Sequence, residues 1–142
     1  MIAYLDTSVL LRVLLNQKNK LAAFTEIDRA ISSKLLKIEC LRTIDRLRLT
    51  EELSESEYLS SIEQLYSSFD TIEFIDVSDF ILNRAGMSFP VSIGTLDAIH
   101  LISAQYWKER NDFDLYFLTH DQLLGKAAKV LGFKVQGLES GI

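Results

Sequence analysis

Short runs of strand-forming residues alternate with longer helical patterns along the whole of this chain. β-branched and aromatic residues predict five strands, at residues 2–5, 30–33, 71–77, 114–121 and 133–136. Apolar residues spaced three and four apart predict helices at residues 8–16, 21–29, 34–49, 54–68, 78–88, 95–110 and 122–131. Strands that alternate with helices predict a parallel sheet between helical layers. The expected fold class is therefore α/β, with a central parallel β-sheet flanked by helices.

The size and composition of the chain favour one globular domain. Its 142 residues include one proline and six glycines, which leaves little room for a linker. We therefore expect a single domain over residues 1–142. The formal net charge of −5 argues against a protein coated in positive charge for nonspecific nucleic-acid binding, although it is compatible with a local basic patch.

The first apolar run and the single cysteine bear on where such a protein works. No Lys or Arg precedes the apolar run, and Asp6 interrupts it, which is unlike a secretory signal. No stretch of about 18 apolar residues exists to span a membrane. Cys40 has no second cysteine to pair with, so we expect a buried thiol rather than a disulfide or zinc site. These features predict a cytoplasmic protein with no membrane partner.

Two acidic residues follow predicted strands directly. Asp6 comes after the strand at residues 2–5, and Asp121 ends the segment at residues 114–121. Sites in parallel α/β folds form at the carboxyl ends of strands. Each aspartate can also cap the helix that follows it, and for either residue alone capping is the simpler interpretation.

Two further acids lie within predicted helices. Glu39 shares a helix face with Arg42 and Arg46. The simple interpretation is a Glu39–Arg42 surface pair, and the alternative is a metal-directed carboxylate with both arginines contacting RNA phosphates. Asp97 lies in the apolar stretch GTLDAIHLISA, where a charge needs a partner. That partner is either a metal ion or a neighbouring arginine.

The four acids together suggest a chemistry that none of them suggests alone. If the sheet brings them together, their negative charges repel one another. A hard divalent cation makes such a cluster tolerable, and Mg²⁺ and Mn²⁺ prefer oxygen ligands. Such ions activate water and stabilise a displaced phosphate oxygen, so water would be the nucleophile.

Four stretches resemble one family in the family's own order. They are LDTSVLL (residues 5–11), SSKLLKIECLR (32–42), GTLDAIHLISA (94–104) and LTHDQLLGKAAKVLGFKV (118–135), and they span nearly the whole chain. The sequence resembles a PIN domain, and within that family a VapC-type toxin ribonuclease of a type II toxin–antitoxin pair. The resemblance implies a PIN-like fold and a Mg²⁺- or Mn²⁺-dependent endoribonuclease. It also implies an RNA substrate, a cognate antitoxin protein and a homodimer.

The resemblance also implies roles for individual residues. The family's acidic quartet falls on Asp6, Glu39, Asp97 and Asp121. Asp6 and Asp97 would bind the metal most directly, Glu39 would act through water, and Asp121 would lie further out or serve a second ion. Thr7 and Thr119 would support the carboxylates. The family usually carries a basic residue near position 96, whereas Gly94 and Thr95 stand there in this chain, which puts one phosphate contact in doubt.

Other interpretations remain open from the sequence. A receiver domain would need a lysine at a late strand end, where this chain has Thr119, His120 and Asp121. A phosphatase with an aspartate nucleophile would need an acid two residues after Asp6, where Ser8 stands. A catalytically inactive module with the same fold that binds RNA or protein is the main alternative.

The two histidines have simpler interpretations than catalysis. His100, three residues after Asp97, is expected to be a packed or hydrogen-bonded helix residue rather than a general base. His120 is expected to face solvent.

Overall fold

The computed structural model describes residues 1–139, and its centre is a five-stranded sheet with the order β3-β2-β1-β4-β5. All four pairings between neighbouring strands are parallel. This arrangement confirms the predicted α/β fold with a central parallel sheet. The strands are β1 (Ile2–Leu5), β2 (Arg29–Ser33), β3 (Ile72–Ile75), β4 (Tyr116–Leu118) and β5 (Lys134–Gln136).

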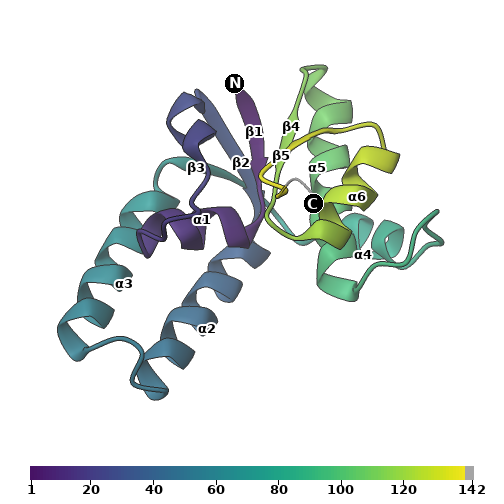
Figure 1. Ribbon diagram of the computed structural model, residues 1–142. Helices are drawn as coiled ribbons and strands as arrows, with labels where there is room; N and C mark the ends of the chain where they lie inside the picture. Colours follow the sequence, from purple (N-terminus) through teal and green to yellow (C-terminus); the bar gives the residue numbers. More distant parts are fainter. Residues whose placement is uncertain (140–142) are drawn as a thin grey trace.

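Within residues 1–139, six α-helices flank the sheet, three toward each side (Figure 1). One group comprises α1 (Thr7–Leu14), α2 (Leu35–Leu49) and α3 (Glu55–Phe69). The other comprises α4 (Asp79–Ala85), α5 (Thr95–Asn111) and α6 (Gln122–Val130). None of the helices in residues 1–139 combines the length and apolarity that crossing a lipid bilayer requires.

The predicted helix at residues 21–29 is wrong. Only a short 3₁₀ segment, Ala22–Glu26, forms there, and Arg29 already begins β2. The carbonyl oxygen of Met1 accepts hydrogen bonds from the backbone N–H groups of Asp28 and Arg29. Pairing with the first strand thus draws the end of this segment into the sheet, and tertiary contacts override the local helical pattern.

The two faces of the sheet carry separate apolar cores, because side chains alternate along each strand. Tyr4 packs with Leu101 and Leu124 of the second helical group. Its neighbours Ala3 and Leu5 pack on the opposite face with residues of the first group. β1 is therefore buried on both faces, which is typical of the central strand in a parallel sheet.

The carboxyl ends of β1 and β4 lie side by side. Leu5 is opposite Leu118, and the backbone N–H of Asp6 donates to the carbonyl oxygen of Leu118 at 2.9 Å. The residue after β4, Thr119, donates its backbone N–H to Gln136 of β5 at 3.1 Å. These bonds fix the start of both loops that carry strand-end acids.

The segment after β5 packs closely against the turn after β4. Gly137 has a φ of 106°, and a Cβ atom at this position would lie 2.4 Å from the carbonyl oxygen of Thr119. Glycine is favoured here because it permits both the left-handed backbone and the close approach. The turn that carries Thr119 and Asp121 is thereby held both by the hydrogen bond from Thr119 to Gln136 and by its packing against Gly137.

Candidate active site

Asp6 lies at the end of β1 and is only 7% exposed. It occupies the N-cap position of α1, but its side chain makes no capping hydrogen bond, so the simple capping interpretation is wrong for this carboxylate. Instead its Oδ2 accepts hydrogen bonds from the hydroxyls of Ser8 at 2.7 Å and Thr119 at 2.8 Å. Within residues 1–139, no hydrogen bond reaches its Oδ1. The two hydroxyls therefore orient the carboxylate and leave one oxygen available.

Asp121 does cap a helix. Its Oδ1 accepts the backbone N–H of Leu124 at 2.9 Å, at the first turn of α6. The hydroxyl oxygen of Thr119 in turn accepts the backbone N–H of Asp121 at 3.0 Å. Thr119 thus contacts both strand-end acids, one through its proton and one through its lone pair. Capping occupies only part of a carboxylate's accepting capacity, so it is compatible with a further role for Asp121.

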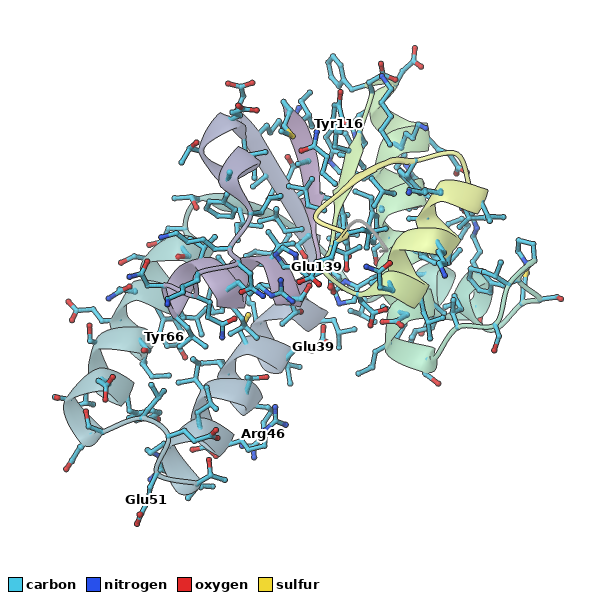
Figure 2. All side chains as sticks on the ribbon, viewed as in Figure 1. Glu39, Arg46, Glu51, Tyr66, Tyr116 and Glu139 are labelled. Carbon is cyan, nitrogen blue, oxygen red and sulfur yellow. The ribbon has the colours of Figure 1, made fainter. Side chains whose placement is uncertain are left out.

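Glu39 projects from α2 toward the end of the sheet (Figure 2). Its Oε1 accepts the hydroxyl of Thr7 at 3.0 Å and contacts Nε2 of His100 at 2.6 Å. The simpler interpretation of a Glu39–Arg42 pair is wrong, because Arg42 pairs with Asp45 at 3.2 Å. Arg46 is exposed and lies further along α2, away from the sheet (Figure 2). Contact of Arg42 and Arg46 with RNA phosphates stays a prediction.

Asp97 lies in the first turn of α5 and is partly buried. Within residues 1–139, its carboxylate makes no hydrogen bond or ion pair, so the alternative of a neighbouring arginine as its partner is wrong for these residues. The pKa of Asp97 is raised to about 6, chiefly by burial and in addition by the negative charges of Asp121 and Asp6, with a smaller contribution from Glu39. The four acids therefore lie within electrostatic range of one another, although they come from four separate parts of the chain.

The donor set fits a hydrated magnesium ion. As the side chains stand, no three His, Cys, Asp or Glu residues in the described chain converge closely enough to enclose a metal. The negative charges of Asp121, Asp6 and Glu39 nevertheless act on Asp97 and help to raise its pKa. Mg²⁺ keeps several of its waters and needs only one or two protein carboxylates, so a tight cage is not required. One carboxylate oxygen of Asp6 and both carboxylate oxygens of Asp97 have no hydrogen bond within residues 1–139, so these two acids have oxygens available for an ion.

Two residues in the site have roles that the sequence did not predict. Ser8 links the loop after β1 to the loop after β4, since it donates to Asp6 and accepts the backbone N–H of His120 at 3.1 Å. His120 does not face solvent as predicted. Its Nδ1 donates to the carbonyl oxygen of Gly137 at 2.7 Å, and its Nε2 is buried without a partner in residues 1–139. The contacts of His120 with Ser8 and with Gly137 join residues that are too far apart in sequence for a local pattern to indicate them.

His100 is a buried, hydrogen-bonded helix residue, as predicted. It is 1% exposed, and its two ring nitrogens contact Tyr4 and Glu39. Cys40 is also buried as predicted, and burial raises the pKa of its thiol to about 12. A thiol that stays protonated is a poor nucleophile, so Cys40 has no part in the chemistry of this site.

Comparison with known protein families identifies the family of this chain. The family described as the PIN domain matches residues 3–130, which include all four acids of the site. No curated protein sequence matches the chain significantly.

Proposed function

Because the chain belongs to the PIN domain family, whose members are generally nucleases that bind nucleic acid and typically use divalent metals, we propose that it is a Mg²⁺- or Mn²⁺-dependent endoribonuclease. The observation that supports this most is the setting of Asp97. Its carboxylate is partly buried beside other acids, and no cation pairs with it among residues 1–139. A divalent cation would relieve that repulsion.

In this proposal Asp6 and Asp97 bind the metal directly. Glu39 acts through a water molecule, and Asp121 lies further out or serves a second ion. When bound, the ion would activate water and stabilise the charge that develops on a displaced phosphate oxygen. Ser8 and Thr119 would keep one oxygen of Asp6 oriented, through the hydroxyl bonds described above. Thr7 and His100 would do the same for Glu39.

Water is the proposed nucleophile because the side chains of the site are engaged otherwise. The hydroxyls of Thr7, Ser8 and Thr119 each donate to a carboxylate of the proposed metal site, and none contacts a histidine or lysine side chain within residues 1–139 that would activate it as a nucleophile. The thiol of Cys40 stays protonated. Hydrolysis of a phosphodiester by water is therefore the reaction that this set of residues supports best.

We expect the purified protein to cleave RNA with Mg²⁺ or Mn²⁺, to stop in EDTA, and to resume when Mn²⁺ is added in excess. Total cellular RNA is a suitable substrate, because nothing in the site identifies one RNA class. Gel analysis of the fragments gives the readout. Cleavage that continues in EDTA would contradict a metal mechanism, and RNA binding without cleavage under any metal would favour an inactive binding module.

We further propose that the protein is a VapC-type toxin with a cognate antitoxin, acting in the cytoplasm as a homodimer built from one PIN domain per chain over residues 1–142. The four sequence stretches that resemble such toxins support this. The acidic character of the site indicates how an antitoxin would mask it, with an Arg or Lys side chain placed near Asp6 and Asp97.

Co-expression with the adjacent reading frame is expected to yield a stable complex with no RNA cleavage. The neighbouring product should carry a C-terminal segment with Arg or Lys, and replacing that basic residue with Ala should restore cleavage without preventing purification of the partner. Co-purification and the RNA assay provide the two measurements. A protein that cleaves RNA freely and binds no neighbouring product would contradict the toxin–antitoxin proposal.

A further inference from the structure

A buried chain of hydrogen bonds leads from the sheet to Glu39. The backbone N–H of Ser33, at the end of β2, donates to the hydroxyl oxygen of Tyr4 at 3.2 Å. That hydroxyl contacts Nδ1 of His100 at 2.7 Å. The opposite ring nitrogen, Nε2, contacts Oε1 of Glu39 at 2.6 Å. This series of hydrogen bonds thus crosses from β2 through β1 and α5 to α2.

The order of donors and acceptors along this series of hydrogen bonds shows which atom carries each proton. Tyr4 is fully buried, and burial raises its pKa, so the phenol keeps its proton. Its oxygen accepts the N–H of Ser33, and we infer that the phenolic proton is donated to Nδ1 of His100, which lies 2.7 Å away. A neutral histidine that accepts at Nδ1 carries its proton at Nε2 and donates it to Glu39.

The surroundings hold this arrangement in place. The ring of Tyr4 stacks on Phe117 of β4, with 5.1 Å between ring centroids. The rings of Tyr4 and His100 meet edge to face at 5.8 Å. Because both rings are fixed by packing, the direction of the Nε2–H bond is fixed as well. A donor with one direction restricts the rotamers of the flexible Glu39 side chain.

We propose that His100 is a positioning residue, whose Nε2–H, set by Tyr4, holds Glu39 in the orientation that RNA cleavage requires. This inference rests on the proposed nuclease function. His100 acts through Glu39 rather than on the substrate, because it is 1% exposed and out of contact with solvent. Thr7 supplies the second donor to the same oxygen, and Oε2 of Glu39 has no hydrogen bond within residues 1–139.

The proton assignment can be tested without metal or RNA. The chain has two histidines, so ¹⁵N NMR of the rings gives a simple spectrum. At alkaline pH, with both rings neutral, His100 is expected as the Nε2–H tautomer. His120 is expected as the opposite Nδ1–H tautomer, because its Nδ1 donates to a carbonyl oxygen. Tyr4→Phe should weaken the preference at His100 alone. An Nδ1–H tautomer at His100 would overturn the inference.

The positioning role can be tested by comparing two substitutions. Removal of a residue that orients a metal-site carboxylate typically costs about 10–100-fold in activity. We expect His100→Leu to lower kcat by that factor with little change in KM. His100→Gln, which keeps an N–H donor near the position of Nε2, should recover most of the loss. A structural role alone would not separate these two variants at a temperature where both are folded.

Ser103→Ala is the matched control for this comparison. Ser103 lies one turn further along α5, is fully buried, and donates its hydroxyl to the carbonyl oxygen of Ile99 rather than to the site. We expect its kcat to stay within about twofold of wild type, since the substitution removes only a hydroxyl that contacts the backbone of its own helix. An active wild type with an equally active His100→Leu would overturn only the positioning role. A wild type that cleaves no RNA with any metal would overturn the nuclease function itself.

Discussion

RNA cleavage is expected to fall roughly 10²–10³-fold in Asp97→Asn and in Asp6→Asn, the range typical for loss of a group that stabilises charge in the transition state. Asparagine keeps the shape of the side chain and can still accept the hydroxyls that contact Asp6. It removes the negative charge that would bind the cation. The comparison therefore isolates charge from shape, and kcat/KM for one RNA at fixed Mg²⁺ is the measurement.

Asp79→Asn is the control for the effect of charge at a helix start. Asp79 lies in the first turn of α4, as Asp97 lies in that of α5, but it is exposed and outside the site. Its substitution should leave cleavage unchanged and alter stability only by the few tenths of a kcal/mol expected of a helix-dipole contact. Full activity in the Asp97 and Asp6 variants would show that these acids are structural, and the metal proposal would fail.

In EDTA, Asp97→Asn is expected to be more stable than wild type at pH 7, and this advantage should disappear by about pH 4. The pKa of Asp97 is raised in the folded protein from its ordinary 3.8 to about 6. A raised pKa means that the folded state binds the proton more tightly than the unfolded state, so stability is lost as pH rises through about 4 to 6. Asparagine resembles the protonated acid and does not suffer this loss.

The expected advantage is on the order of 1 kcal/mol at pH 7, because solvent screens a group that is only half buried. In a domain of this size that corresponds to roughly 2–4 °C in Tm. Other groups titrate in the opposite direction. The pKa of Asp45 is lowered by Arg48, and that of Glu57 by the backbone N–H of Ser54. Both are common to the two proteins, so the difference in Tm between variant and wild type is the quantity to follow.

Addition of Mg²⁺ should make wild type more stable than Asp97→Asn. A ligand that binds only the native state stabilises it by mass action, so wild type should gain Tm with Mg²⁺ while Asp97→Asn gains much less. Thermal melts at pH 4 and pH 7, with EDTA or Mg²⁺, provide the four conditions. An Asp97 variant that melts well below wild type in EDTA, with an unchanged response to Mg²⁺, would identify Asp97 as a structural residue.

The layout of the sheet was predictable because its signals are local. Alternation of short strand-forming runs with helical patterns located all five strands, and Ser54 and Ser78 cap α3 and α4 within three residues of themselves. The exception was residues 21–29. Apolar spacing there predicts a helix, but the pairing of Asp28 and Arg29 with Met1 draws the chain into the sheet. A bond across the fold outweighed the local preference.

The candidate site was predictable only in part. Its acids stand in recognisable stretches, whereas the groups that orient them are joined over long distances in sequence. Thr119 contacts Asp6, and His100 contacts both Tyr4 and Glu39. His100 resembles any core histidine in the sequence, and nothing near His120 indicates that Gly137 accepts from its ring. Such contacts follow from the order of the strands and not from spacing along the chain.

The central position of β1 has a consequence for the protein during its own synthesis. β1 is translated long before its partner on one side, β4, which begins only at Tyr116. Until then one edge of β1 stays unpaired, and Asp6 lacks the hydroxyl of Thr119. A nascent or prematurely terminated chain therefore carries an incomplete acidic site and an open strand edge, which favours aggregation or proteolysis over activity. Asp6 therefore gains the hydroxyl of Thr119 only after translation has passed that residue.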